Sequence, residues 1–375
     1  MEIVINTIPL LSPLTGVGHY TYQIAKHLRT IDSSNDYTYF YGYYSKKLFT
    51  YKENRGKFYR IKEIVKKNHT VSLALRGLSG AINKFSSSNF DLYFEPNTIP
   101  INIRAKYIIT MVPDFSLKVH PEWHPKDRVV YFERNFIKNV DRIDRIIVIS
   151  DYIKRSAMEL FKFPESKLKT IYLGIDTGVF KVYAPQDLLH VKERYSLPHN
   201  FILFVGSIEP RKNLKNLLLS YRILREKAGR DFKLVLAGFK GWENKAIMDL
   251  LDSVRNEVLY IGYIPDEELG KLYNLADLFV FPSFYEGFGL PPLEAMACGC
   301  PVVASRAASL PEVCGDAAYY VDPYDTESIA DGMYNVLIDS LLRQNLINKG
   351  LERSRLFSWK DSAQEHLETF REVVQ

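Results

Sequence analysis

Two adjacent cations, Arg211 and Lys212, follow a strongly apolar run of sequence. The run, Phe201–Val205, is typical of a buried strand and ends in Gly206 and Ser207, with a helix expected soon after the cations. Ligands of parallel sheets bind outside the carboxyl ends of the strands, so both side chains would lie at the lip of a cleft. A guanidinium offers a planar fork to phosphate oxygens, and a neighbouring ammonium adds a point charge. The motif therefore predicts a diphosphate site, against the alternative of a solvated basic turn.

Two glutamates, Glu286 and Glu294, flank a glycine-bearing turn in the second half of the chain. The apolar run Leu278–Phe281 precedes the turn, and two consecutive prolines after it suit the start of a helix. The backbone N–H groups of Gly289 and Leu290 would then face an anion at that helix N-terminus. A carboxylate accepts hydrogen bonds from paired hydroxyls, which suits a ribose or a hexose. Ordinary surface glutamates are the alternative, and the turn sequence Glu-Gly-Phe-Gly-Leu-Pro makes the binding site the more specific interpretation.

Another glycine-bearing turn follows the first predicted strand, Glu2–Asn6, and contains Gly16 and Gly18. Glycines there allow the backbone to approach a phosphate or a sugar closely. The turn is not a full dinucleotide-binding fingerprint, because Thr21 stands where the third glycine would be. Alone it is a weak signal.

Short apolar strands alternate with longer helical segments along the chain, which is the pattern of βαβ units and doubly wound sheets. The strands are expected at 2–6, 37–41, 91–95, 107–112, 145–149 and 169–173, and then at 201–205, 233–237, 258–261, 278–281, 301–304 and 318–321. The two sets lie on either side of a linker at 174–200. We therefore expect an α/β protein with two facing Rossmann-like, doubly wound parallel-sheet domains and a cleft between them. The predicted units are 1–180, 181–356 and a C-terminal crossover helix within 357–375 that packs back on the first domain.

Composition indicates an ordinary globular protein. The chain has 375 residues, 25% of them charged, and a net charge of +5 that is too small to indicate a nucleic-acid-binding protein. The odd, sparse set of Cys298, Cys300 and Cys314 argues against a disulfide framework. A zinc site lacks nearby histidines and a fourth ligand, so the cysteines are expected to be buried small hydrophobes. The sequence begins like a strand rather than a signal peptide, and no apolar run approaches about 18 residues, which favours a cytoplasmic protein.

Taken together, the motifs resemble those of family 4 glycosyltransferases with the GT-B fold. The matching segments span nearly the whole chain: Gly16-Val-Gly18, Gly206-Ser-Ile-Glu-Pro-Arg-Lys-Asn213, Glu286 and Glu294 with seven residues between them, and Cys298-Gly-Cys-Pro-Val-Val-Ala304. The resemblance implies a retaining enzyme without a metal or other cofactor, and no Asp-x-Asp metal motif occurs in the sequence. It further implies that the first domain binds an acceptor and the second a nucleotide-sugar donor.

The resemblance also implies roles for single residues. Arg211 and Lys212 would hold the donor diphosphate, Glu294 the ribose, and Glu286 hydroxyls of the transferred sugar. With Asp114, the first two and Glu286 are the expected catalytic residues. The other expected donor contacts are Gly16, Gly18, Ser207, Phe288, Gly289 and Leu290, with Tyr263 and Ile264 flanking the nucleobase.

One position departs from the family pattern. The family often has His-Asp after the fourth strand of its first domain, whereas this chain has Pro113 followed by Asp114. A histidine role does not transfer to a proline, and Asp114 remains a candidate for contacting the donor sugar or the acceptor. His120 is a candidate acceptor-binding residue that would substitute for the missing histidine, and a structural histidine is the alternative.

The donor and the reaction leave several alternatives. The second-half motifs are similar to those of bacterial mannosyltransferases that use GDP-mannose, so mannose is the first expectation and a UDP-hexose the second. A nucleotide-sugar epimerase of the same fold is an alternative, and a phosphorylase would need a cofactor-binding lysine context that is not found. A non-catalytic nucleotide-sugar-binding protein is disfavoured by the intact set of charged motif residues.

The acceptor is expected to be a saccharide or a lipid-linked glycan. Residues 61–85 combine basic and apolar side chains, which would either rest on the inner face of an anionic membrane or form a solvated helix face. An aromatic cluster in the first domain would either stack on sugar rings or pack in a strand. Its members are Tyr37, Tyr39, Phe40, Tyr41, Tyr43 and Tyr44.

Overall fold

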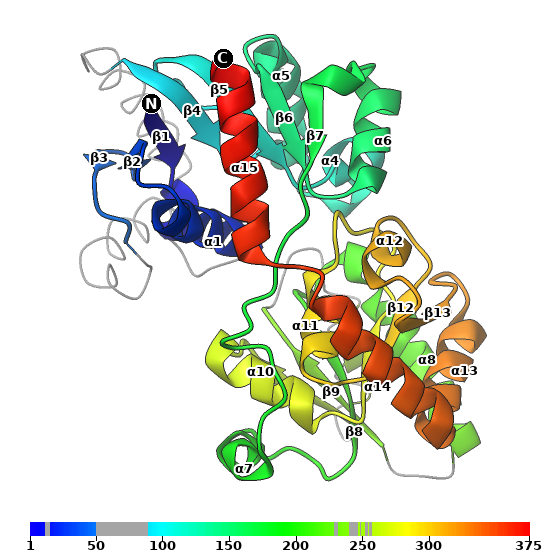
Figure 1. Ribbon diagram of the computed structural model, residues 1–375. Coiled ribbons are helices and arrows are strands. Elements are labelled where there is room, and N and C mark those ends of the chain that lie inside the picture. The colour runs from blue at the N-terminus through cyan, green and yellow to red at the C-terminus, as the bar shows by residue number, and fades with distance from the viewer. Residues whose placement is uncertain are drawn as a thin grey trace.

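The computed structural model describes residues 1–11, 16–49, 89–228, 232–239, 247, 249–251, 254 and 257–375. These residues form two sheets of almost entirely parallel strands, and each sheet has its own helices (Figure 1). The chain leaves the first sheet after β7 and enters the second at β8. It returns to the first through its last helix, α15 (Trp359–Val374), drawn in red in Figure 1.

The first sheet has seven strands in the order β3-β2-β1-β4-β5-β6-β7, and only β3 runs antiparallel to its neighbour. Its strands are β1 (Glu2–Asn6), β2 (Asp36–Phe40), β3 (Tyr44–Ser45), β4 (Phe90–Glu95), β5 (Ala105–Val112), β6 (Arg145–Val148) and β7 (Leu168–Thr170). Its helices include α1 (Gly16–Ile31), α4 (Ser116–Val119), α5 (Lys126–Val140) and α6 (Asp151–Phe161).

The second sheet has six parallel strands in the order β10-β9-β8-β11-β12-β13. They are β8 (Phe201–Val205), β9 (Lys233–Ala237), β10 (Val258–Gly262), β11 (Leu278–Phe281), β12 (Val302–Ser305) and β13 (Ala318–Val321). The helices of this half include α7 (Pro185–Arg194), α8 (Leu214–Ala228), α10 (Asp266–Leu275), α11 (Leu290–Ala297), α12 (Leu310–Cys314), α13 (Thr326–Ile338) and α14 (Ser340–Ser354).

Burial of both sheet faces explains the apolar strand sequences. All four residues of β11 and the first four of β8 are buried, and the two strands are hydrogen-bonded neighbours. The chain segments that follow them therefore emerge at the same sheet edge. All twelve predicted strands are confirmed to within a few residues. The short antiparallel β3 was not predicted, because two residues show no hydrophobic period.

The aromatic cluster of the first half mostly packs in the core. Tyr39, Phe40 and Tyr41 are at most 3% exposed, and Tyr37 is 8% exposed, whereas Tyr43 is 43% exposed. Packing, the second of the two predicted roles, therefore accounts for the buried members. The three cysteines are buried free thiols, as expected. The basic segment 61–85 lies outside the described residues. Among those that are described, no helix is both long and apolar enough to cross a membrane.

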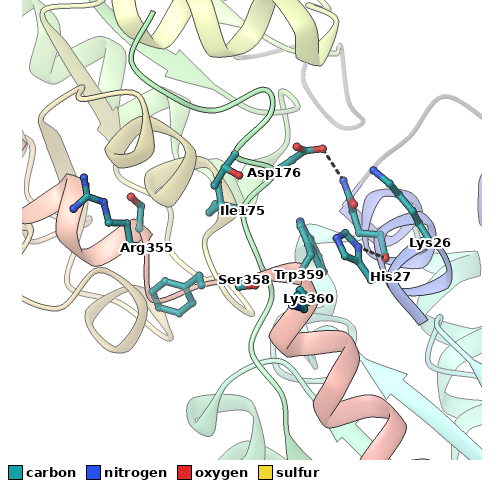
Figure 2. Close-up of a pocket in the computed structure, with 12 residues that line it drawn as sticks. Lys26, His27, Ile175, Asp176, Arg355, Ser358, Trp359 and Lys360 are labelled. Atoms are coloured by element: carbon teal, nitrogen blue, oxygen red, sulfur yellow. Dashed lines mark hydrogen bonds between the residues drawn. The ribbon is translucent and has the colours of Figure 1, made fainter. Parts of the chain in front are cut away.

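Two chain crossings run side by side between the domains (Figure 2). Ile175 pairs with Ser358 in a parallel bridge, and its backbone N–H donates to the Phe357 carbonyl at 3.1 Å. A Cβ on Gly174 would lie 2.0 Å from the backbone nitrogen of Trp359, so only glycine permits this approach. A groove of about 330 Å³ lies beside the crossings, where Asp176 accepts a hydrogen bond from Gln23 of α1 at 3.0 Å (Figure 2).

Helix α15 packs on α1 and on the first sheet. Tyr20 and His366 are hydrogen-bonded through the hydroxyl and Nε2, and both side chains are buried. The Phe370 ring packs against Phe94 of β4 with 5.2 Å between the centroids. The last helix of the chain therefore contributes to the core of the first domain and joins the two ends of the sequence.

We expect His366 to make the protein sensitive to mild acid. Burial lowers the pKa of His366 to about 4, from an ordinary value of 6.5. The folded state therefore binds fewer protons than the unfolded state, and stability is lost as the pH falls from about 6.5 towards 4. The loss is on the order of 3 kcal/mol for a shift of this size. Relative to His366→Gln, the wild-type unfolding free energy should decline over this pH range, measured by denaturant titration. If the difference in unfolding free energy between the two proteins stays constant over this pH range, the lowered pKa of His366 is wrong.

Candidate active site

A cleft of about 780 Å³ lies between the two domains at the carboxyl ends of their strands. Met111 and Ile149 line it from the first sheet, and Val205 and Ala237 from the second. Its volume lies in the range of small-molecule sites. Twelve of the expected site residues line it: Gly16, Asp114, Ser207, Arg211, Lys212, Tyr263, Ile264, Glu286, Phe288, Gly289, Leu290 and Glu294. Gly18, within α1, and His120 are not among its lining residues.

The centre of the second-domain wall is a compact cluster of charges. Arg211 Nη1 lies 2.6 Å from Glu286 Oε2, and Lys212 Nζ lies 2.7 Å from Glu286 Oε1. Arg211 Nη2 lies 2.8 Å from Glu209 Oε1. The Lys212 ammonium also sits over the Phe281 ring, 4.8 Å from its centroid. Glu286 thus bridges both cations, with 9% of its side chain exposed, and is not a surface charge.

The pKa shifts of the cluster follow from burial and pairing. Burial opposes the charge of Arg211, but Glu286 and Glu209 outweigh it and raise the pKa of the guanidinium. Burial also opposes the charge of Glu286, but Arg211 and Lys212 lower the pKa of its carboxyl. Burial lowers the pKa of Lys212, and Glu286 offsets this only in part. The cluster thus pairs two cations with two carboxylates.

Local chain geometry brings the two motifs together. The turn η4 (Pro210–Lys212) follows β8 and ends at Asn213, whose φ of 61° is left-handed. The Asn213 side chain donates to the carbonyls of Pro282 at 3.0 Å and Pro323 at 2.6 Å. The backbone N–H of Phe284 donates to the Arg211 carbonyl at 3.0 Å. The turn after β8 and the turn after β11 are thus bonded to each other, which fixes the cations opposite Glu286.

Helix α11 begins at the turn that carries Glu286. Its N-cap Gly289 has φ 114°, and a Cβ there would also lie 2.6 Å from Leu310 Cδ2, so glycine is required. The first turn contains Pro291 and Pro292, which have no N–H group. The N–H groups of Gly289 and Leu290 are therefore the donors that this end of the helix offers to the cleft.

Glu294 lies on α11, apart from the charge cluster. Its Oε2 accepts a hydrogen bond from the buried hydroxyl of Tyr273 at 3.1 Å. Burial, with a contribution from Asp266, raises the pKa of Glu294 to about 8. Tyr263 and Ile264 also line the cleft. Tyr263 is 46% exposed and stacks on Phe239 with 4.5 Å between ring centroids, so the pair presents an exposed aromatic surface.

The first-domain wall contains a histidine that the sequence analysis missed. Asp114 Oδ1 accepts hydrogen bonds from the backbone N–H and hydroxyl of Ser116, at 2.8 and 2.6 Å. His124 Nε2 lies 2.9 Å from the Ser116 hydroxyl oxygen, and both residues line the cleft. Since that hydroxyl donates to Asp114, His124 Nε2–H is the donor to Ser116. Burial lowers the pKa of His124, so it is a neutral polar group on this wall.

His120 lies outside the cleft lining. Its ring stacks on Trp123 with 3.8 Å between centroids, and its Nδ1 lies 3.2 Å from a carboxylate oxygen of Glu122. These contacts favour a structural histidine over acceptor binding. A second histidine four residues later, in the sequence His-Pro-Glu-Trp-His, was the signal available for finding His124.

Comparison with known proteins agrees with this geometry. The chain is 32% identical to O-antigen chain mannosyltransferase B of Escherichia coli over 99% of its own length and 100% of that protein. It is also 33% identical to the serotype-specific mannosyltransferase WbdA of Escherichia coli, over 65% of this chain and 31% of WbdA. The similarity thus covers both domains and the charge cluster.

The fold comparison extends to solved structures. The structure superposes on that of WaaG, a glycosyltransferase involved in lipopolysaccharide biosynthesis, with a TM-score of 0.68 and 14% identity over 99% of each chain. The expected GT-B fold of two facing Rossmann-like domains is thereby confirmed. Residues 186–353 match the family model described as glycosyl transferases group 1. The chain therefore belongs to the group 1 glycosyl transferases and is a GT-B glycosyltransferase.

Proposed function

We propose that this protein is a retaining, metal-independent mannosyltransferase that moves mannose from GDP-mannose to a saccharide or lipid-linked glycan in polysaccharide biosynthesis. The observation that carries the proposal is the pairing of both cleft cations, Arg211 and Lys212, with Glu286. Buried charges need partners. A buried carboxylate that pairs with both cations marks the position where an anionic group of the substrate would bind.

Donor binding then exchanges one anion for another. The diphosphate takes the hydrogen bonds of Arg211 and Lys212, and the Gly289 and Leu290 N–H groups add donors at the start of α11. Glu286, released from one or both cations, accepts hydrogen bonds from hydroxyls of the transferred sugar. As the anomeric C–O bond breaks, negative charge grows on the leaving phosphate, and the fixed cations stabilise it. The electrons of that bond leave with the phosphate, an acceptor hydroxyl oxygen bonds to the anomeric carbon, and the proton of that hydroxyl is released to the nucleoside diphosphate or to water.

The remaining donor contacts follow from the cleft walls. Glu294 accepts hydrogen bonds from the ribose hydroxyls, and the exposed face of Tyr263 stacks on the base beside Ile264. Ser207 lies near the phosphates, and the first domain supplies Asp114 opposite them. Mannose and guanine are proposed because of the likeness to two mannosyltransferases. A UDP-hexose remains the second candidate donor.

The acceptor is proposed to bind against the first domain. In this proposal the protein works in the cytoplasm, and residues 61–85 bring it to the inner face of an anionic membrane when the acceptor is lipid-linked. Their basic and apolar composition supports this placement. Asp114 and His124 are among the polar groups that line that wall.

The test of the reaction is a panel of nucleotide sugars with a mannose-containing acceptor. We expect nucleoside diphosphate release from GDP-mannose above that from UDP-hexoses, and an α-linked product by NMR, since the donor is an α-anomer. An epimerase would release altered sugar without an acceptor. A non-catalytic protein would bind the donor and release nothing. A β-linked product would overturn retention.

We expect chelation to leave transfer unchanged. Arg211 and Lys212 supply the positive charge that a divalent ion would otherwise contribute to a departing diphosphate. Steady-state rates of nucleoside diphosphate release should therefore be equal with and without excess EDTA. A fall in rate that added Mg²⁺ or Mn²⁺ restores would contradict metal independence.

A further inference from the structure

The turn that carries Glu286 is also where the second domain inserts into the first. Tyr285, the preceding residue, is 4% exposed and belongs to an apolar cluster otherwise built from the first domain, including Phe115. Its ring packs edge-on against His120 and Tyr152, with centroids 5.8 and 5.9 Å away. The side chain of Tyr285 is thus a core residue of the opposite domain.

The backbone of the same residue is bound to the charge cluster. Arg211 Nη1 donates to the Tyr285 carbonyl at 3.1 Å and to Glu286 Oε2 at 2.6 Å. A shift of the Tyr285 ring would therefore move a carbonyl and a carboxylate that both orient Arg211. The ring lies in one domain, and the cation that its backbone orients lies in the other.

Gly287, on the other side of Glu286 from Tyr285, is also in close contact with the first domain. A Cβ on Gly287 would lie 2.0 Å from the Pro113 carbonyl oxygen and 3.1 Å from Asp114 Cβ. The Ser150 hydroxyl donates to the Gly287 carbonyl at 2.8 Å. Glu286 is therefore flanked on both sides by residues whose positions the first domain determines.

A second contact between the two domains involves Glu312. Glu312 of α12 accepts hydrogen bonds from the backbone N–H groups of Asp151 and Tyr152, at 2.6 and 2.9 Å. These groups begin α6 of the first domain, and α12 lies next to α6 in Figure 1. The contact favours a negative charge at a helix N-terminus. It is polar and exchangeable with water, whereas the Tyr285 contact buries apolar surface.

We propose that Tyr285 is a positioning residue that couples closure of the two domains to alignment of Glu286 and Arg211. With its ring seated in the first domain, the charge cluster has the geometry described above. With the ring withdrawn, the turn loses its anchor, and Glu286 no longer faces Arg211 from a fixed position. The inference rests on the proposed glycosyl transfer for its kinetic readout and on domain geometry alone for its structural readout.

The ring rather than the hydroxyl performs this role. The Tyr285 hydroxyl is buried and makes no hydrogen bond to a side chain within the described part of the chain; its polar neighbour is the backbone of Phe115. Phenylalanine would keep the apolar contact, so Tyr285→Phe serves as the conservative variant. Tyr324→Ala is the matched control. It removes the same kind of ring from the other side of the turn, where Tyr324 is 71% exposed and stacks on Phe284.

The experiment compares wild type, Tyr285→Phe, Tyr285→Ala and Tyr324→Ala by small-angle X-ray scattering, GDP binding and steady-state kinetics. For Tyr285→Ala we expect a larger radius of gyration and a kcat reduced about 100-fold, since a displacement near 1 Å can cost that much. GDP affinity should change far less than kcat, because the proposed ribose and base contacts, Glu294 and Tyr263, lie outside the turn that Tyr285 anchors. The other two variants should match wild type in all three measurements.

Three results would overturn the proposal. They are wild-type scattering for Tyr285→Ala, an expanded Tyr285→Ala with wild-type kcat, and a Tyr285→Phe as impaired as the alanine variant. If the wild-type protein transfers no sugar from any donor, the proposed function fails. The scattering comparison then still decides whether Tyr285 holds the domains closed.

Discussion

Replacing Lys212 by alanine should reduce sugar transfer by about 10²–10³-fold, since fixed positive charge on a departing group is worth about 3–4 kcal/mol of transition-state stabilisation. The Lys212 side chain is 10% exposed, and its ammonium has Glu286 as a carboxylate partner at 2.7 Å. Low exposure means that little water would compensate for its loss. The measurement is nucleoside diphosphate release at saturating donor and acceptor. The loss should appear in kcat, because the charge acts most strongly on the leaving phosphate.

The matched control is Lys215→Ala. Lys215 lies three residues further along the chain, on the exposed surface of α8. It should lose no more than about twofold, since isolated surface charges contribute little. Lys212→Met separates charge from packing, because it keeps an apolar stem over the Phe281 ring. A Lys212→Met enzyme with wild-type kcat would show that the charge is not used in transfer.

The strand pattern was sufficient to predict where the cations lie. The apolar runs Phe201–Val205 and Leu278–Phe281 identified two buried parallel strands, and the motif residues follow their carboxyl ends. That the two strands are neighbours depends on the order of the sheet, which strand sequences alone do not specify. The resemblance to a known family implied the two-domain fold but no strand order.

The partners of individual side chains were harder to predict. Glu286 was expected to face sugar hydroxyls, and the structure also pairs it with Arg211 and Lys212, because buried cations take the nearest anion. His124 was missed because its place on the wall depends on a short helix and a 3-10 turn, whose geometry no periodicity reports. The role of Tyr285 depends on how the two domains meet, and a contact between residues 115 and 285 leaves no trace in local sequence.

Glu286→Gln should abolish most transfer while strengthening the hold on nucleoside diphosphate. The substitution keeps the size of the side chain but removes the negative charge that two buried cations share. We expect kcat to fall by about 10²–10³-fold, because the transferred sugar loses a charged acceptor of its hydroxyl hydrogen bonds. We also expect tighter GDP binding, because the diphosphate no longer competes with a carboxylate for Arg211 and Lys212.

The thermal stability of Glu286→Gln should depend on GDP more strongly than that of the wild type. An unpaired buried charge costs about 3–5 kcal/mol, so the ligand-free variant should melt at a lower temperature than wild type. GDP restores the missing anion, and its addition should raise the melting temperature of Glu286→Gln by more than that of wild type. Thermal unfolding with and without GDP measures both effects.

Glu294→Gln is the matched control for this competition. Glu294 is a buried carboxylate of the same motif, but its hydrogen bond comes from Tyr273 rather than from a cation. Because burial raises the pKa of Glu294 to about 8, its neutral form is favoured near pH 7, and the uncharged amide should be tolerated. Its GDP affinity should fall, since it is proposed to hold the ribose. If both variants weaken GDP binding equally, Glu286 does not compete with the diphosphate, and the cations are paired with it for structural reasons alone.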